Sequence, residues 1–349
     1  MNSTNKEDKK MKRFKVLSIL MAVMFLLTAT AFGADPTTLK KNVWNAEQIF
    51  KKGVTAENFI TLNGSPVATA SSELFYVRST TGSDTRGNDQ GLSWKKPFAT
   101  LDYANDQCTA SQGCTIILLP YHAETEAAAA SIATLNVAGV NVIGIGEEAA
   151  MPSFTIAHAD GTLTVSAADI RLSGIRFVSN LDNVKVLLTM SATSDGSIVE
   201  NCQFRDSAAD KDYLVGISVA AAAHGVKIKN NSFMTTAAAG GNNAILTLAV
   251  TGLEVIGNVA HGKFATGVML GSGKITRGVI RDNIFVNAEA AIAVALENTS
   301  TGILAGNFLG GTTSMAAALT GDDAMWCFEN YISGAVAVSG LINPAVDAD

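Results

Sequence analysis

Apolar residues in the second half of the chain follow a long period. Between Ile170 and Ile332 one short pattern returns, as in V-K-I-K-N-N-S-F at Val226–Phe233: two or three apolar residues, a turn-forming residue, an asparagine, and a large apolar residue two places on. When the copies are aligned, one column holds Ile175, Cys202, Asn231, Asn258, Asn283, Asn307 and Asn330, at steps of 27, 29, 27, 25, 24 and 23 residues. Such a period is typical of a solenoid, and we expect the column to continue upstream to Ile145.

Two more columns show what each repeat contains. Two places after the asparagine column are Phe177, Phe204, Phe233, Ala260, Phe285, Leu309 and Ile332, and three places before it are Val142, Leu172, Val199, Ile228, Val255, Ile280, Leu304 and Cys327. The residues between them alternate as in strands, and a second strand follows in each repeat, for example at Val219 and Val294. The pattern therefore predicts an all-β protein, a parallel β-helix in which stacked asparagine side chains hydrogen-bond along the stack.

The first 34 residues have the features of a secretory signal. Basic residues precede the apolar run Val16–Leu27, which is too short to span a bilayer, and small residues follow it. A retained membrane anchor is the alternative. Residues 35–72 differ from the repeats and are interpreted as an N-terminal extension, used either for attachment or oligomerisation or as a plain cap on the first coil.

Charge limits the choice of partners. The first 34 residues carry six basic and two acidic residues, so the remainder has a net charge of −10, against −6 for the whole chain. Nucleic-acid binding usually requires a basic stripe, and none is visible, so we expect no nucleic-acid partner. After cleavage of the signal we expect no membrane association, and a secreted or cell-surface location.

One block resembles a known group of proteins. It runs F-Y-V-R-S-T-T-G-S-D from Phe75, continues through P-F-A-T-L at Pro97–Leu101, and ends with the strand Ile116–Pro120. This is similar to the opening segment of secreted and virion-associated right-handed parallel β-helix proteins of the pectate-lyase-like superfamily. Tyr121 departs from the glycine usual there. The resemblance implies a right-handed parallel β-helix and, among virion-type members, a trimer.

The expected domain plan follows from these assignments. Residues 73–115 lead into the β-helix and include an amphipathic capping helix around Thr100–Ala104. Residues 116–335 form the parallel β-helix, with about nine coils in all, and residues 336–349 are a C-terminal tail.

Two small sites are predicted in the opening segment. Asp84, Asn88 and Asp89 supply oxygen ligands in a glycine-rich loop and form a candidate calcium site, although these residue types also make turns unaided. Cys108 and Cys114 flank a five-residue loop and are expected to form a disulfide. Cys202 and Cys327 are separated by five rungs of about 4.8 Å each, beyond disulfide reach, and are expected to be buried thiols.

Catalytic chemistry has weak support. Polysaccharide lyases and hydrolases need acids clustered on neighbouring coils, but the outward positions pair opposite charges, Glu200 beside Lys229 and Lys227 beside Glu254. The histidines, including His122, do not converge. We therefore expect a non-enzymatic extracytoplasmic protein, a surface, matrix or virion-like structural or adhesive component, with glycans as candidate ligands and no cofactor. The alternative is a lyase or hydrolase acting on an acidic polysaccharide.

The outward face becomes apolar toward the C-terminus. Its later rungs carry five large apolar residues: Ile256, Val279, Ile303, Trp326 and Phe328. A contiguous strip of this kind marks an interaction surface. Either the C-terminal tail folds back over it, or it packs against other copies of the chain in a homo-oligomer.

Overall fold

The computed structural model describes residues 60–62, 65–68, 73–85, 87, 89–126, 128, 130–236, 241–288, 292–311, 319–320, 325–333 and 340–342. All of these belong to the second of the two units into which the chain divides, Ala56–Asp349. The predicted signal peptide and most of the predicted extension and tail lie outside the described residues. Within the described part, no helix has both the length and the apolar character needed to cross a membrane.

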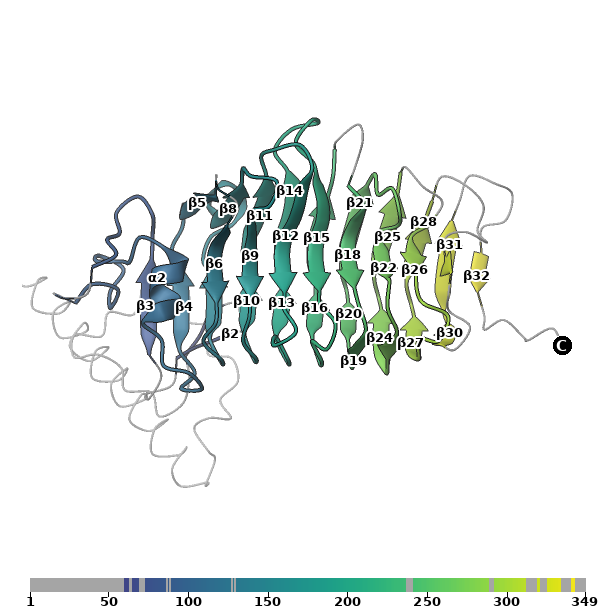
Figure 1. Ribbon diagram of the computed structural model, residues 1–349, viewed down its shortest axis with the longest axis horizontal. Helices are drawn as coiled ribbons and strands as arrows, with labels where there is room; N and C mark the ends of the chain where they lie inside the picture. The colour runs from purple at the N-terminus through teal and green to yellow at the C-terminus, as the bar shows by residue number, and fades with distance from the viewer. Residues whose placement is uncertain are drawn as a thin grey trace, which may run out of the picture. The chain divides into compact units, whose positions relative to one another are not determined.

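The described chain is a parallel β-helix in which each coil contributes short strands to three sheets (Figure 1). The first sheet runs in chain order through β3 (Leu74–Val77), β4 (Thr115–Leu118), β7 (Asn141–Gly144), β10 (Arg171–Ser173), β13 (Ile198–Glu200), β16 (Lys227–Lys229), β20 (Glu254–Ile256), β24 (Gly278–Arg281), β27 (Gly302–Ala305) and β30 (Met325–Phe328). The predicted fold class, an all-β parallel solenoid, is confirmed.

The second sheet lies one turn further along each coil. Its strands are β5 (Ala123–Glu126), β8 (Ser153–Ile156), β11 (Arg176–Ser179), β14 (Gln203–Asp206), β17 (Ser232–Met234), β21 (Val259–Gly262), β25 (Ile284–Asn287), β28 (Phe308–Gly310), β31 (Asn330–Ser333) and β32 (Gly340–Ile342). All neighbouring strands in this sheet are parallel except the last, because β32 runs antiparallel to β31.

The third sheet closes the coil with β6 (Ser131–Leu135), β9 (Thr162–Val165), β12 (Val184–Met190), β15 (Tyr213–Val219), β18 (Asn243–Thr247), β22 (Met269–Gly271), β26 (Val294–Ala295) and β29 (Leu319–Thr320). Two short pairs lie outside these sheets: β1 (Ile60–Leu62) with β2 (Ser65–Ala68), and β19 (Val250–Thr251) with β23 (Ile275–Thr276). With ten, ten and eight strands described, the sheets agree only approximately with the expected nine coils.

The register of the sheets matches the predicted columns. In the first sheet Leu172 pairs with Val199, and the same column continues in register to Cys327. In the second sheet Phe177 pairs with Phe204 and the column continues to Ile332. The phenylalanine rings stack inside the coil, with the centroid of Phe204 4.8 Å from that of Phe177 and 4.7 Å from that of Phe233.

The asparagine column forms a continuous hydrogen-bond ladder. The Nδ2 group of each asparagine donates to Oδ1 of the asparagine on the next coil, at 3.0 Å from Asn231 to Asn258 and 2.8 Å from Asn307 to Asn330. The same Oδ1 also accepts the backbone N–H of the preceding asparagine, and Nδ2 also donates to a carbonyl of the preceding coil, such as Ile228 for Asn258. Each interior amide is therefore satisfied although it is fully buried.

The ladder ends at Cys202. Its backbone N–H donates to Oδ1 of Asn231 at 2.9 Å, and its sulfur lies 3.9 Å from the carbonyl oxygen of Leu172, in the position that an asparagine Nδ2 takes on later coils. Burial raises the pKa of this thiol to about 12, so the thiolate is strongly disfavoured in the folded protein.

The expected upstream continuation of the column at Ile145 agrees with the register of the first sheet, where Leu172 pairs with Val142 and Ser173 with Ile143, so that Ile145 follows in the place of Ile175. The second sheet is offset by an insertion, because Arg176 pairs with Ser153 and not with Gly146. The residues from Gly146 to Pro152, including a 3-10 turn at Glu148–Ala150, are inserted between β7 and β8. Ile145 is half-buried at the start of this insertion, whereas Ile175 is fully buried.

Helix α2 (Leu101–Asp106) packs against β3, β4 and β6, at the N-terminal end of the described coils (Figure 1). Its N-terminus is held by two carboxylates. Asp84 accepts hydrogen bonds from the backbone N–H groups of Ala99 and Thr100 and from the Thr100 hydroxyl, and Glu124 Oε1 accepts the N–H of Leu101 at 2.8 Å. These bonds satisfy donors that a helix N-terminus otherwise leaves without partners.

Phe204→Ala should lower the free energy of unfolding by about 3–5 kcal/mol, because it removes a ring from the middle of a close-packed stack. Lys227→Ala is the control, since its side chain lies on the outward face and a surface ion pair contributes less than about 1 kcal/mol. Urea denaturation measures both. Equal sensitivity of the two variants would contradict the inward and outward assignment.

Asn258→Ala should cost about 2–4 kcal/mol, because it leaves the backbone N–H of Asn231 and the carbonyl of Ile228 buried without their amide partners. Ser232→Ala, on the exposed face of β17, should change stability by less than about 0.5 kcal/mol. The same denaturation experiment compares them, and an unchanged midpoint for Asn258→Ala would show that the ladder contributes little.

Candidate functional site

The corner between the first and second sheets has one repeated conformation. The residue that precedes the ladder position has positive φ on every coil from β10 onward: Gly174, Asn201, Asn230, Gly257, Asp282, Gly306 and Glu329. Glycine, asparagine and aspartate adopt this left-handed region most readily, which explains the turn-forming residue of the sequence pattern. The corner residues face outward and line the surface between the two sheets.

A groove of about 650 Å3 lies on this corner at coils β7, β10 and β13. The insertion between β7 and β8 forms one wall with Glu147, Glu148 and Met151. Gly144 and Gly174 lie at its base, where their coils approach so closely that a Cβ at Gly144 would lie 2.1 Å from the carbonyl oxygen of Gly174. The groove therefore depends on glycine at this point.

Hydrogen-bonding side chains from three coils converge on the groove. Ser173, Asn201 and Gln203 line it together with Glu147 and Glu148, which are exposed. Arg176 braces the wall, because its Nε donates to Gln203 Oε1 at 3.0 Å and its Nη2 donates to the carbonyl of Glu148 at 2.6 Å. Burial, and then the nearby positive charge of Arg205, lower the pKa of Arg176. The pattern Glu147-Glu148 with Gln203 was not recognised as a site in the sequence.

The outward face of the first sheet carries ion pairs between neighbouring coils. Arg171 forms an ion pair with Glu200. The Glu254 carboxylate forms ion pairs with two ammonium groups, with Nζ of Lys229 at 2.5 Å and Nζ of Lys227 at 3.4 Å. Burial alone would raise the pKa of Glu254, but the ammonium groups lower it below its ordinary value. The predicted opposite-charge pattern is present, although Glu200 takes Arg171 as its partner where Lys229 was expected.

Two carboxylates meet on adjacent coils between the second and third sheets. Asp212 is buried, and its Oδ1 accepts the backbone N–H of Asn183 at 2.8 Å. Burial raises the pKa of Asp212, and the neighbouring Asp182 carboxylate raises it further.

The candidate calcium residues are placed only in part. Both oxygens of Asp84 are engaged at the N-terminus of α2, Asp89 is an exposed turn residue with positive φ, and Asn88 lies outside the described residues. Sequence reasoning missed the structural role of Asp84. Calcium binding in this loop stays a prediction.

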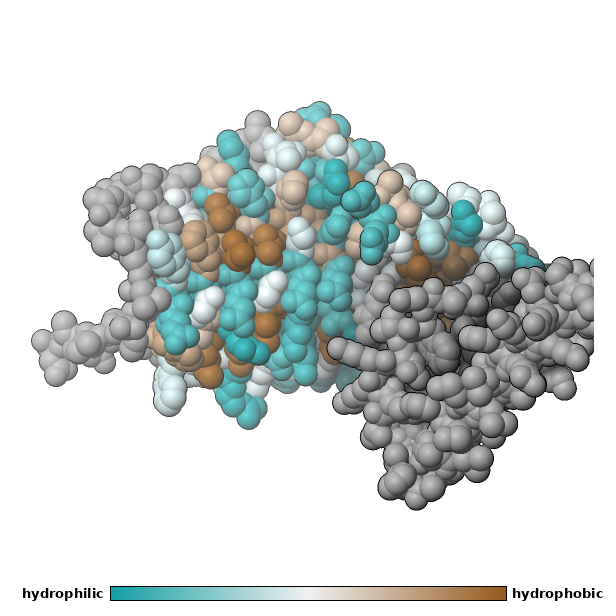
Figure 2. Space-filling view, turned by 180° about the vertical axis from the view of Figure 1, so that it is seen from behind, coloured by the Kyte–Doolittle hydropathy of each residue, from teal (hydrophilic) through white to brown (hydrophobic). Residues whose placement is uncertain are grey.

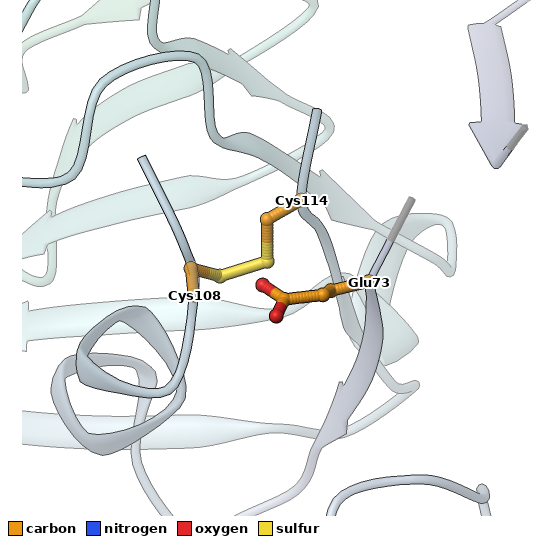
Figure 3. Close-up of side chains that lie close together, drawn as sticks. All are labelled: Glu73, Cys108 and Cys114. Atoms are coloured by element: carbon orange, nitrogen blue, oxygen red, sulfur yellow. A yellow bond between two sulfur atoms is a disulfide. The ribbon is translucent and has the colours of Figure 1, made fainter. Parts of the chain in front are cut away.

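Cys108 and Cys114 form a disulfide, with Cα atoms 5.8 Å apart, and Figure 3 shows Glu73 directed toward it. Glu73 binds the segment between the two cysteines, because its carboxylate accepts the N–H of Thr109 at 2.7 Å and the Thr109 hydroxyl at 3.0 Å. The bridge therefore links the segment after α2 to the start of β4, and the Glu73 carboxylate links the same segment to the start of β3. Cys202 and Cys327 are buried outside this bridge.

His122 is buried, not a surface turn residue. Its Nδ1 accepts the backbone N–H of Ser79 at 3.1 Å, so the proton of the neutral ring is on Nε2, which donates to Glu124 Oε1 at 2.8 Å. The Ser79 hydroxyl accepts the N–H of Ala123 at 3.1 Å. This cluster holds α2 on the first coils, because Glu124 also accepts the N–H of Leu101.

The predicted interface residues form two outward columns of the first sheet. Val279, Ile303 and Trp326 are in register with one another, and Ile256 and Phe328 belong to the second column. Trp326, Phe328 and Ile303 are exposed, and the other two are half-buried.

The fold and its corner groove define a parallel β-helix protein. No protein-family model matches the chain, and no curated protein matches it. Among solved structures it is similar to a GH136 lacto-N-biosidase from Eubacterium ramulus, with a TM-score of 0.36 and 10% sequence identity over 74% of this chain. The chain spans 58% of that structure. A likeness of this degree carries no information on activity, and membership of the pectate-lyase-like superfamily stays a prediction.

Asp212→Asn should raise stability at neutral pH relative to the wild type. A carboxyl whose folded pKa lies above its ordinary value of 3.8 is protonated in both states at low pH, and it destabilises the fold as pH rises through the folded pKa. The gain should therefore be small near about pH 4 and larger near about pH 7. Urea midpoints at both pH values test this, with exposed Asp210→Asn as control. A gain of equal size at both pH values would contradict it.

Proposed function

We propose that this chain is an exported, non-enzymatic β-helix protein that binds a glycan in the corner groove. The supporting observation is the groove itself, which is lined by Ser173, Asn201 and Gln203 together with Glu147, Glu148 and apolar residues such as Met151. Amide and carboxylate groups supply paired donors and acceptors for hydroxyl groups, and concave sites with a few convergent polar groups are the usual binding sites of proteins. The disulfide supports an oxidising compartment.

The charge of the groove favours a neutral or amino-bearing glycan. Its two exposed carboxylates would repel an acidic polysaccharide, and the nearby guanidinium of Arg176 is engaged with Gln203 and Glu148. Arg176 is hydrogen-bonded to both walls of the groove, so the groove is already ordered before a ligand binds. This lowers the conformational entropy that is lost on binding. A surface or matrix component with such a groove would act in adhesion to a glycan-bearing surface.

Asn201→Gly tests this site without disturbing the turn, because glycine adopts the positive φ of Asn201 at no steric cost. Asn230→Gly is the matched control, since Asn230 occupies the same corner one coil further on and does not line the groove. On a glycan array followed by calorimetry, Asn201→Gly should weaken binding about tenfold, equivalent to about 1.4 kcal/mol, while Asn230→Gly should bind as the wild type does. Equal loss in both variants, or no binding by the wild type, would refute the proposal.

Glycoside hydrolysis is the second candidate function, favoured by the two carboxylates of the groove wall, Glu147 and Glu148. Incubating the same glycans with the protein and measuring new reducing ends separates the two functions. Release of products that is lost in Glu147→Gln or Glu148→Gln, with binding retained, would replace the non-enzymatic proposal by a hydrolase.

A further inference from the structure

A second surface lies at the C-terminal end of the described coils, away from the groove. We define the apolar strip as two adjoining sets of outward residues. The first-sheet set is Ile256, Val279, Ile303, Trp326 and Phe328, and the second-sheet set is Val259, Ile284, Phe308 and Tyr331. The second set was not recognised in the sequence, and it is separated from the first only by the corner turns.

The strip is exposed as well as apolar. Trp326 is 77% exposed and Ile284 47%, and Val259, Tyr331, Phe328, Ile303 and Phe308 are between 36% and 44%. In Figure 2 one group of hydrophobic residues lies on the left of the described surface, toward the C-terminal strands, another lies on its right, and hydrophilic residues cover most of its middle. Contiguous exposed apolar surface of this kind marks an interaction site.

Charge makes this face the best place for two copies to meet. Residues 35–349 have a net charge of −10, so two copies repel one another overall. Inside the strip, Arg281 and Asp282 form an ion pair at 3.3 Å and cancel each other. The earlier rungs of the first sheet carry the charged residues Arg171, Glu200, Lys227, Lys229 and Glu254 instead.

The strip has both a projecting side chain and a hollow beside it. Trp326 borders a hollow of about 530 Å3 whose base is formed by Gly278 and Gly302. No side chain can fill this base, because a Cβ at Gly302 would lie 2.0 Å from the carbonyl oxygen of Gly278. A two-fold interface places the same patch on both partners, so the Trp326 of each copy can enter the hollow of the other. Tryptophan buried in a pocket is the usual energetic centre of an interface.

The C-terminal tail is the competing occupant. Its described part, β32, pairs antiparallel with β31, with Tyr331 opposite Leu341. Residues Gly340–Ile342 therefore extend the edge of the second sheet and do not lie over its outward face. These three residues of the short tail therefore do not cover the apolar strip.

We infer that the apolar strip is the interface of a two-fold homodimer. In this dimer the Trp326 indole of each copy occupies the hollow of the other copy. This inference does not rest on glycan binding, because the groove and the strip lie on different coils. It also makes the trimer implied by the sequence resemblance the less favoured assembly, since a ring requires two different patches.

Light scattering and sedimentation velocity on residues 35–349 test the proposal. The wild type should be a dimer, and Trp326→Lys should weaken association at least tenfold. Trp94→Lys is the matched control, because Trp94 is also well exposed, at 64%, but belongs to the opening segment. Val279→Trp fills the hollow without altering Trp326 and should also weaken association, and thermal unfolding of each variant confirms that it folds.

Several outcomes would overturn the inference. These are a monomeric wild type, a dimer that survives Trp326→Lys and Val279→Trp, and a trimer. A monomeric wild type whose Trp326 fluorescence shifts on adding glycans, with no shift in Trp326→Phe, would instead make the strip a carbohydrate platform. Loss of the dimer in Trp326→Lys but not in Trp94→Lys would support the inference.

Discussion

Amide hydrogen bonding along the stack is the interaction on which the later coils, from Asn231 to Asn330, depend. A carboxamide can donate and accept along one line, so a buried asparagine on each of these coils bonds its neighbours in the stack. The same side chain also accepts a backbone N–H that the tight corner leaves without a strand partner. Polar groups in the interior are costly without partners, and this arrangement makes them fix the register between coils.

Because inward-facing residues hold the corner in place, its outward-facing residues can differ from coil to coil. The ladder and the phenylalanine stack occupy the inward positions, and the left-handed turn residue needs only a small or flexible side chain. The outward positions are then free to carry ion pairs on the early coils, a groove where one coil has an insertion, and apolar side chains on the late coils. One scaffold thus presents three different surfaces without changing its core.

The periodic part of this structure could be predicted from the sequence. The columns of Phe177 and Leu172 repeat at a nearly constant step, and the step alone places them in register. The features that break the period could not be predicted in the same way. The insertion after Ile145 is one of them, and its only signal in the sequence is the step of 30 residues from Ile145 to Ile175, the longest in the column. The contacts of Glu124 with His122 and of Asp182 with Asp212 depend on how loops meet in space, and no spacing in the sequence signals them.

The antiparallel direction of β32 has a consequence for growth of the stack. A parallel β-helix exposes an open strand edge at its last coil, and such an edge is a template on which another chain can add. Because β32 reverses direction on the second sheet, a further coil of the same kind cannot continue that sheet in parallel register. The reversed strand therefore prevents this sheet from growing by the parallel pairing that joins its other coils.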